Sequence, residues 1–311
     1  MTSYERKVFK ELALPTKETV IPVLLTSLLK HNGSIKEFGA GKQDFSDEIA
    51  ERLGLSERQR SFLMQALVRK ENRIKTFPAW HRLLFRTADL AAKCRLLSHP
   101  KETVILTQKR EWMLTEKGLD EALRLSQIPL ERKIELPVRT HEVQKVKNKL
   151  EQAKRVENYN PIDTRKRIVK TARESLIRTR GFRQAILEAY DYCCSFCGMK
   201  IISPDKLLWE VEAAYIVPHR FYGKDDIWNG IAFCHFHHWA FDVGWFTLRS
   251  NYSIQGSEKI KELPIGYGIM DNHDLMRGFF LSNRTIRLPK RSASYPHINS
   301  ICWHRENIFH K

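Results

Sequence analysis

The 311-residue sequence has no long apolar run and few cysteines. No stretch approaches the ~18 consecutive apolar residues of a membrane-spanning helix, and the first residues lack the apolar core of a secretion signal. Membrane insertion and secretion are therefore not indicated, and the cytoplasm is the expected compartment. Six cysteines are too few for a disulfide scaffold in a chain of this length, and Cys94 and Cys302 are expected to be ordinary buried thiols.

Acidic residues are scarce relative to basic ones. The chain carries 53 lysines and arginines against 36 aspartates and glutamates, a formal net charge of +17. Such a surplus favours a polyanionic partner, because lysine and arginine gain affinity by displacing counterions from phosphates. A basic protein without such a partner is the alternative. The length favours two domains, and a hydrophobic content of 42% suffices for buried cores.

The apolar pattern of residues 1–130 predicts helices followed by a hairpin. A helix that ends at a glycine is expected over residues 20–33, and further helices are expected over residues 44–55 and 79–97. Residues 102–118 fit two short strands around a Gln-Lys-Arg turn. Helices followed by a basic hairpin are the order of a winged helix.

The segment SDEIAERLGLSE, the tryptophan-led helix after it and the closing WMLTEKG are similar to the amino-terminal winged-helix domain of Mrr-type restriction proteins. The resemblance is one of pattern and covers residues 15–125. It implies contact with double-stranded DNA, with Lys109 and Arg110 in the wing on phosphates and Arg82 and Arg86 on the preceding helix at a groove. The alternative is a set of packed helices that contacts no nucleic acid.

A charged connector follows at residues 131–180. Between residues 131 and 183, 16 lysines and arginines stand against 7 acidic residues, a net charge of +9. A basic helical linker beside two DNA-binding modules would follow the backbone of a duplex. The alternative is a solvated helical spacer.

Four cysteines and a histidine gather within a short part of the chain. Cys193, Cys194, Cys197 and Cys234 lie within 42 residues, and this clustering indicates a metal site in a reducing compartment. Cys194 and Cys197 form one pair with ligand spacing, and Cys234 and His237 repeat it. These four residues can furnish a closed tetrahedral set that suits structural zinc, with Cys193 as a substitute ligand. Unconnected buried cysteines are the alternative.

His238 and Asp242 stand four residues apart directly after the second pair. On a helix, this spacing places both side chains on one face, where they can hold one divalent cation. Imidazole and carboxylate ligands with water in the remaining positions suit magnesium or manganese, which would stabilise the leaving 3′ oxygen of a phosphodiester. A simple helical ion pair is the alternative.

The ordered set of CSFC, EVEAAYIVPH, WNG, CHFHH and FDVGWFTL resembles the HNH endonuclease family, whose ββα fold grips one catalytic metal. The entry FRQAILEAY and the ending WHRENIF extend the resemblance over residues 170–311. In such enzymes the histidine before IVP activates water, the asparagine orients the hairpin or that base, and the last histidine binds metal. The resemblance assigns the asparagine to Asn229 and the last histidine to His238.

Tyr215 occupies the place of the first histidine, and Ala214 precedes it where other members often have a metal ligand. Glu212 would share the face of Ala214 on a strand and is a candidate helper for the ion. A phenol titrates near ~10 and is protonated at neutral pH, whereas histidine titrates near ~6.5 and can accept a proton from water. A nearby metal or arginine that lowered the pKa of Tyr215 would make its phenol a base or nucleophile. His219 stands roughly 13 Å further along an extended strand, too far to replace it unless the Pro218 turn folds it back.

The expected fold class is α+β, with a winged helix over residues 1–130, the basic helical linker over 131–180 and a ββα-metal domain over 181–311. The expected function is hydrolysis of double-stranded DNA, with or without modified bases, leaving a 5′ phosphate and a 3′ hydroxyl in a restriction setting. Replacing Tyr215 by histidine should raise an attenuated activity. The rivals are a catalytically inactive HNH-fold DNA-binding protein and a nuclease for RNA or a mobile-element nicking enzyme. One such site attacks one strand, so double-strand cutting requires a homodimer or two successive nicks.

Overall fold

The structure is a computed structural model that describes residues 2–36, 45–68, 73–163, 171–262 and 284–310. It divides into two compact units, Met1–Gln144 and Lys145–Lys311. Both contain helices and strands, so the predicted α+β class is confirmed. Within the described ranges, no helix is long and apolar enough to cross a membrane.

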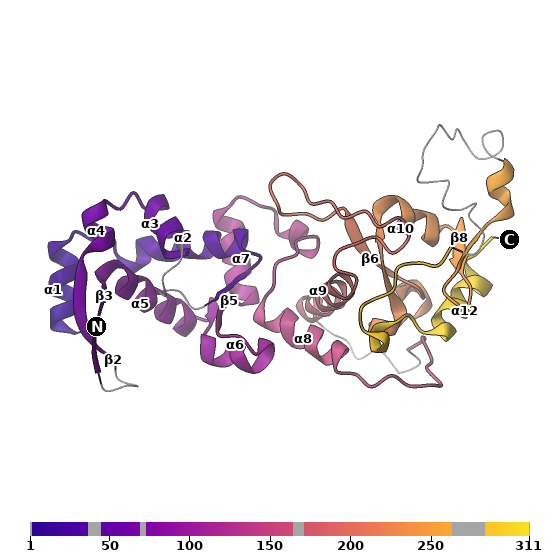
Figure 1. The fold of residues 1–311 in the computed structure, drawn as a ribbon, viewed down its shortest axis with the longest axis horizontal. Coiled ribbons are helices and arrows are strands. Elements are labelled where there is room, and N and C mark those ends of the chain that lie inside the picture. The colour runs from indigo at the N-terminus through magenta and orange to yellow at the C-terminus, as the bar shows by residue number, and fades with distance from the viewer. Residues whose placement is uncertain (1, 37–44, 69–72, 164–170, 263–283, 311) are drawn as a thin grey trace. The chain divides into compact units, whose positions relative to one another are not determined.

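The amino-terminal unit surrounds a small sheet with helices (Figure 1). The sheet has the order β1-β5-β4, and a separate antiparallel hairpin joins β2 to β3, where the sequence analysis assigned no strands. The helices are α1 (Ser3–Glu11), α2 (Lys17–Lys30), α3 (Phe45–Arg52), α4 (Glu57–Ser61), α5 (Ala79–Lys93), α6 (Pro100–Thr107) and α7 (Glu116–Leu125). The strands are β1 (Ser34–Lys36), β2 (Leu63–Val68), β3 (Arg73–Pro78), β4 (Leu97–Ser98) and β5 (Glu111–Leu114).

The core of this unit lies between α2, α5, α7 and β5, each of which contributes fully buried apolar side chains. Helix α2 ends close to the predicted glycine stop, because Gly33 adopts a φ of +83° and donates its N–H to the Leu28 carbonyl. A Cβ at Gly33 would lie 2.1 Å from the Arg139 carbonyl oxygen. Glycine is therefore required both by the left-handed backbone and by the close approach of another chain segment.

The predicted hairpin over residues 102–118 is wrong in its first half. Residues 102–107 belong to α6, which starts at Pro100 and is capped by the His99 side chain. Proline fits the first helical position, and Gln108 ends the helix in a left-handed conformation with a φ of 58°. A short apolar run such as TVIL does not distinguish strand from helix by its pattern alone, and the helix-start signal decides here.

The basic connector is less available to solvent than its charge suggests. It contains the 3-10 helix η1 (Leu130–Ile134), α8 (His141–Glu151) and the first part of α9 (Ala172–Ala189). Lys133 lies 2.7 Å from Glu116, and Lys147 lies 3.0 Å from Glu188, and both lysines are buried. These internal ion pairs remove part of the +9 from the charge that could face phosphates.

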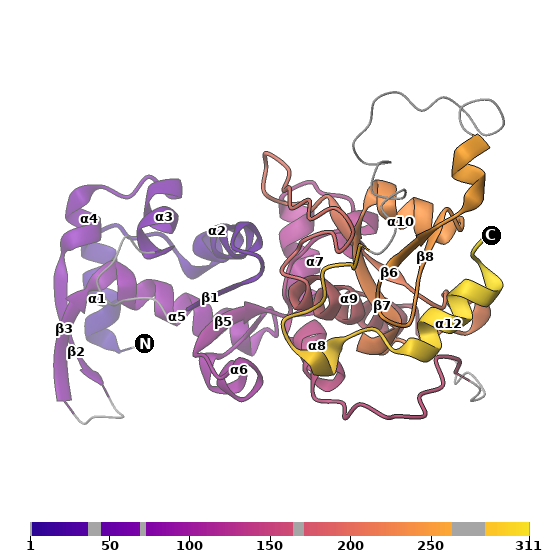
Figure 2. The ribbon, with the colours of Figure 1, turned by 45° about the vertical axis from the view of Figure 1, so that its right-hand side comes forward.

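The carboxy-terminal unit is built around an antiparallel pair of strands. Strand β6 (Val211–Tyr215) pairs with β7 (Gly230–Cys234), and α10 (His235–Asp242) begins directly after β7. Helix α9 packs against β6 and β7 (Figure 2). The remaining elements are β8 (Phe246–Leu248), β9 (Ile254–Gly256), α12 (Ile298–Asn307) and the 3-10 helices η2 (His219–Phe221), η3 (Ile227–Asn229), η4 (Glu258–Glu262) and η5 (Ser292–Ser294). Strand, strand and helix thus follow one another in the expected ββα order.

The closing segment WHRENIF is structural. His304 on α12 is buried, and its ring stacks on Phe241 with the ring centroids 3.7 Å apart. Its Nδ1 lies 2.9 Å from the Thr247 hydroxyl, and its Nε2 lies 3.1 Å from the Phe241 carbonyl oxygen. Burial lowers the pKa of His304 to about 4, so the ring is neutral and joins α12 to α10 and β8.

Candidate functional site

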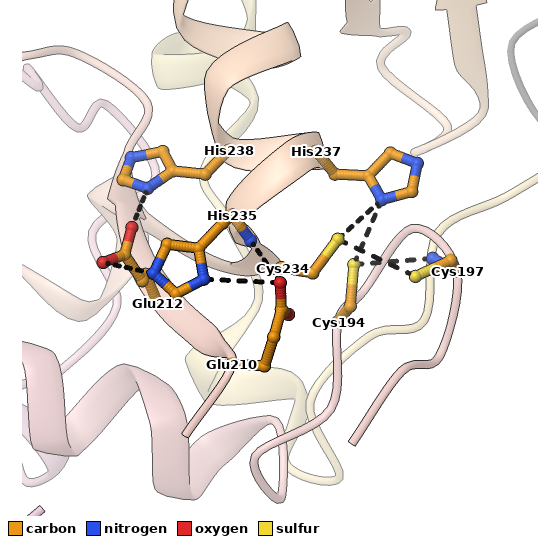
Figure 3. A network of polar contacts seen from close by, with 8 residues as sticks. All are labelled: Cys194, Cys197, Glu210, Glu212, Cys234, His235, His237 and His238. Atoms are coloured by element: carbon orange, nitrogen blue, oxygen red, sulfur yellow. Dashed lines mark hydrogen bonds and ion pairs between the residues drawn. The ribbon is translucent and has the colours of Figure 1, made fainter. Parts of the chain in front are cut away.

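The four predicted metal ligands come together at one point. Cys194 and Cys197 lie in the loop after α9, Cys234 ends β7, and His237 lies in the first turn of α10 (Figure 3). Their ligand atoms all lie within 4.8 Å of one another. The Cys197 and Cys234 sulfurs are 4.0 Å apart, close to the edge of about 3.8 Å expected for a tetrahedron with metal–sulfur bonds of about 2.3 Å.

Backbone hydrogen bonds hold this loop against the sheet. The Ser195 N–H donates to the Ala232 carbonyl on β7, and the Cys194 N–H donates to the Met199 carbonyl, both at 2.8 Å. The Cys197 N–H donates to the Cys194 sulfur at 3.5 Å. The loop is thus shaped to present two sulfurs to the end of β7.

Three sulfurs and one imidazole form a donor set that could hold a metal such as zinc. Hydrogen bonds with the Cys194 and Cys234 sulfurs lower the pKa of Cys197, and the thiolate is the metal-binding form. Cys193 lies outside the set, because its thiol contacts the Asp191 carbonyl. The expectation of buried thiols for Cys94 and Cys302 is wrong, since Cys94 is exposed and Cys302 is partly exposed.

A second polar cluster joins β6 to the outer face of α10. The His238 Nδ1 lies 2.8 Å from a Glu212 oxygen, and the His238 Nε2 lies 3.5 Å from an Asp242 oxygen. Glu212 also lies 3.2 Å from His235, which contacts Glu210 (Figure 3). The structure therefore brings together the predicted pair His238 and Asp242, and it places the predicted helper Glu212 on the histidine.

The charges of this cluster are arranged around one imidazole. Burial opposes protonation of His238, but the Glu212 hydrogen bond and the Asp242 charge together raise its pKa. The His238 hydrogen bond lowers the pKa of Glu212, and burial raises the pKa of Asp242. A carboxylate that fixes one ring nitrogen while the other faces a ligand oxygen is the arrangement of metal-binding histidines. His238 and Asp242 are therefore the residues that could hold one divalent cation.

Tyr215 lies at the end of β6 with its side chain mostly covered. Its ring stacks on Phe182 of α9 with the centroids 4.0 Å apart, and its hydroxyl donates to an Asp225 oxygen at 2.9 Å. Burial and the Asp225 charge raise the pKa of Tyr215 well above that of a free phenol. The phenol is protonated at neutral pH and is a poor candidate for a base or nucleophile.

Asn229 is fully buried and all its contacts are with the backbone. Its Oδ1 accepts from the Val217 N–H at 2.9 Å, and its Nδ2 donates to the Val217 and Lys224 carbonyls at 3.0 and 2.9 Å. In the HNH resemblance the asparagine orients either the hairpin or the base, and these contacts match the first role. Asn229 holds the loop over residues 217–224 and acts through it.

The structure adds two residues that the sequence analysis did not assign, Asp225 and Arg178. The Asp225 carboxylate contacts Tyr215, the Arg178 guanidinium and the His219 Nε2. His219, expected to lie far along a strand, is instead folded back by the turn at Pro218. Asp225 stands in a loop without a spacing motif, so the sequence offered no signal for it.

The amino-terminal candidates divide into two kinds. Arg82 and Arg86 lie 2.7 and 3.1 Å from the buried Glu5 carboxylate. Burial disfavours the charged carboxylate, but the hydrogen bond from Arg82 and those from Thr2 and Arg86 outweigh it and lower the pKa of Glu5 to about 2. Lys109 and Arg110 are exposed between α6 and β5. DNA contact by all four cations stays a prediction, and Arg82 and Arg86 already have an internal partner.

Comparison with known proteins gives a family match for part of the chain. Residues 194–249 match the family model described as HNH endonuclease. A solved structure titled "Modification dependent TagI restriction endonuclease" is similar with a TM-score of 0.28 and 16% identity, over 41% of this chain and 37% of that chain. The chain thus spans well under half of that protein, and no curated protein matches it. The matched segment contains β6, β7, α10 and both polar clusters, so nuclease activity is the function class that the match supports.

Proposed function

We propose that this protein is a metal-dependent endonuclease that hydrolyses phosphodiester bonds of double-stranded DNA. One observation carries the proposal: the chain of contacts from Glu212 through His238 to Asp242, inside the segment that matches the HNH endonuclease model. The hydrolysis leaves a 5′ phosphate and a 3′ hydroxyl. The restriction setting, with or without modified bases in the target, rests on the sequence resemblance.

The catalytic cation would be magnesium or manganese, held by His238 and Asp242. When bound, it supplies electrostatic stabilisation to the phosphate oxygens and to the leaving 3′ oxygen. Glu212 fixes the ring of His238 so that Nε2 keeps its direction toward the Asp242 carboxylate. Asn229 holds the loop that carries Asp225 and His219.

The cluster of Cys194, Cys197, Cys234 and His237 would hold structural zinc. Four protein ligands close the coordination shell and leave no open position for a water or a substrate. The cluster joins the loop after α9 to the start of α10, on which His238 lies. The zinc thereby fixes the helix that presents the catalytic ligands.

The amino-terminal unit would read DNA as a winged helix. Its support is the element order, in which β1 separates α2 from α3 while β4 and β5 follow α5. Strand β5 pairs with both β1 and β4 to form a three-stranded sheet. The exposed Lys109 and Arg110 lie beside β5, where cations can contact phosphates. The cations of the connector that are not in ion pairs would follow the backbone of the duplex, and a homodimer would cut both strands.

A second candidate is a catalytically inactive DNA-binding protein that keeps the nuclease fold. The raised pKa of Tyr215 favours it, because the residue at the position of the family's base cannot accept a proton from water. An enzyme with attenuated activity is intermediate between the active endonuclease and the inactive DNA-binding protein.

The deciding experiment incubates the full chain with modified and unmodified plasmid DNA, and with matched RNA, in magnesium, manganese or a chelator. We expect DNA cleavage that requires a metal and that His238→Ala abolishes. His31→Ala is the matched control, because His31 is also paired with a carboxylate but lies in the amino-terminal unit. DNA binding without cleavage by the parent or by Tyr215→His would contradict the nuclease function, and cleavage of RNA alone would contradict the substrate.

A further inference from the structure

The position that holds a proton-accepting histidine in the related enzymes is filled by a protonated phenol. Directly beside it stands the imidazole of His219, which comes within reach because the Pro218 turn folds the chain back. We propose that His219 is the general base that takes the proton from the attacking water, with Asp225 as its positioning residue. This inference rests on the proposed nuclease function and deepens it.

The turn at Pro218 brings His219 back onto the end of β6. Pro218 has a ψ of 154°, and the next three residues form η2, so the chain reverses instead of continuing as a strand. The ring centroids of His219 and Tyr215 are 4.3 Å apart. Both side chains contact the same Asp225 oxygen at 2.9 Å. The imidazole therefore lies about one side-chain width from the place of a histidine at position 215.

His219 is open to solvent, whereas Tyr215 and Asp225 are mostly covered. The side chain of His219 is 45% exposed, whereas the Asp225 side chain is 10% exposed. Tyr215 is covered by the stacked ring of Phe182, and its hydroxyl is directed at Asp225. Water and a phosphate can reach the imidazole, while the phenol faces the interior.

Asp225 gives the imidazole a defined tautomer. Its carboxylate accepts from the His219 Nε2–H, so Nδ1 is the nitrogen that carries the basic lone pair. Burial disfavours the charged carboxylate, but hydrogen bonds from His219 and the Arg178 charge outweigh it and lower the pKa of Asp225. An ionised carboxylate behind an imidazole also stabilises the imidazolium that forms when a proton is taken.

The loop that carries His219 is held at both ends. Asn229 bonds the backbone at Val217 and Lys224, and the Gly223 N–H donates to the Pro218 carbonyl at 3.1 Å. A Cβ at Gly223 would lie 1.7 Å from the Val217 carbonyl oxygen, so the turn requires glycine there. A base held by its surroundings loses little entropy on reaching the transition state.

The loop also lies beside the predicted metal ligands. The charge of Arg220, the residue after His219, acts on Asp242 and opposes the burial that raises the pKa of that carboxyl. The residue next to His219 therefore stands within electrostatic range of Asp242.

The reaction step balances as an ordinary hydrolysis. A water proton passes to Nδ1 of His219 while the water oxygen forms a bond to phosphorus. The bond from phosphorus to the 3′ oxygen breaks, and that oxygen takes a proton from solvent. His219 then returns its proton to solvent.

The test compares metal-dependent plasmid cleavage by the parent, His219→Ala and the matched control His31→Ala. General-base assistance is typically worth about 100- to 10,000-fold, so His219→Ala should lose cleavage by that factor while DNA binding and melting temperature stay unchanged. Added imidazole should restore part of the lost rate, because the cavity left by the side chain admits a soluble base. His31→Ala should cleave like the parent and should not respond to imidazole.

Asp225→Asn tests the positioning role. It should reduce cleavage by at least about tenfold, and it should add little when combined with His219→Ala, because the two act as one unit. A purely structural role for Asp225 would give additive losses and a lower melting temperature in both backgrounds.

Introducing a histidine at the family's own position gives an independent test. Tyr215→His in the His219→Ala background should restore cleavage, since it returns a base to the same Asp225 environment. Cleavage by His219→Ala within threefold of the parent would overturn the role of His219 and leave the nuclease function standing. A parent that binds DNA and does not cleave, even as Tyr215→His, would overturn the nuclease function and the role of His219 together.

Discussion

Carboxylates in the two units of the chain pair with different kinds of side chain. In the amino-terminal unit, Glu5 is 1% exposed and lies between Arg82 and Arg86. In the carboxy-terminal unit, the partly exposed Glu212 contacts His238, and Asp225 contacts His219 in addition to Arg178. Guanidinium groups stay charged at every accessible pH, whereas imidazoles exchange protons and bind metals near neutrality. The first arrangement can only hold structure, and the second can also perform chemistry.

The units also differ in what holds them together. The amino-terminal core is formed by apolar side chains such as Trp80 and Trp112, which are fully buried. In the carboxy-terminal unit, the apolar core adjoins the cluster of three cysteines and His237. Among the described residues, this metal-binding group belongs to the carboxy-terminal unit, so the stability of that unit should depend on a metal.

Loss of the cluster metal should have the largest effect. Cys234→Ser should lower the zinc content from about one atom per chain to near zero and unfold the carboxy-terminal unit, because zinc binding to such sites contributes about 10–16 kcal/mol of coupled folding free energy. The amino-terminal unit should stay folded. Elemental analysis and amide hydrogen exchange measure the two effects, and Cys193→Ser is the matched control. If Cys234→Ser kept its zinc and its full protection from hydrogen exchange, the stability of the carboxy-terminal unit would not depend on the cluster.

Loss of the proposed metal ligand His238 should have the next largest effect. His238→Ala should reduce metal-dependent cleavage by about 1,000-fold, since a cation at the leaving group supplies several kcal/mol of transition-state stabilisation. Glu212→Gln, which keeps the size of the side chain, should weaken magnesium or manganese activation by about 10- to 100-fold. Cleavage is measured against metal concentration. Equal activation by metal in the parent and in Glu212→Gln would refute the orienting role of Glu212.

The stabilisation that Glu5 gains from Arg82 and Arg86 should be lost only in strong acid. The pKa of Glu5 is lowered from 4.5 to about 2, so its contribution to stability is complete above pH 4.5 and is lost as the pH falls toward 2. Glu5→Gln should destabilise the amino-terminal unit by about 2 kcal/mol at neutral pH and by almost nothing near pH 2. Urea unfolding across this range is the measurement. A destabilisation that is the same at both pH values would show that packing, and not charge, explains Glu5.

Tyr215→Phe should have a smaller effect. It removes the hydroxyl that donates to Asp225 but keeps the ring stacked on Phe182, so the expected loss is about 1 kcal/mol of stability and less than tenfold in cleavage. Urea unfolding and plasmid cleavage measure the two losses. Complete loss of cleavage in Tyr215→Phe would instead make the phenol the catalytic group.

The smallest effect should come from the exposed cations of the amino-terminal unit. Lys109→Ala or Arg110→Ala should each reduce the slope of DNA affinity against salt by about one unit, as expected for a lost phosphate contact. Binding is measured by titration at several salt concentrations. Arg82→Ala serves as the comparison, because its guanidinium is paired with Glu5. An unchanged slope in both exposed variants would argue against DNA contact by the segment between α6 and β5.

Sequence patterns determined the parts of this protein that depend on fixed spacing. The two pairs Cys194 with Cys197 and Cys234 with His237 predicted one cluster, and the i, i+4 spacing of His238 and Asp242 predicted a shared helix face. Helix geometry and ligand loops convert such spacings directly into positions, so these predictions needed no knowledge of the remaining chain.

Tertiary structure alone decided the parts that depend on loops and long-range partners. The turn at Pro218 brings His219 to Asp225, and no local pattern fixes where such a turn leads. Glu5 and Arg82 are 77 residues apart, so their pairing follows from the packing of α1 on α5. The residue type sets the chemistry that a side chain can perform. Contacts across the fold decide which histidine is placed to accept a proton and which arginines are paired with a carboxylate.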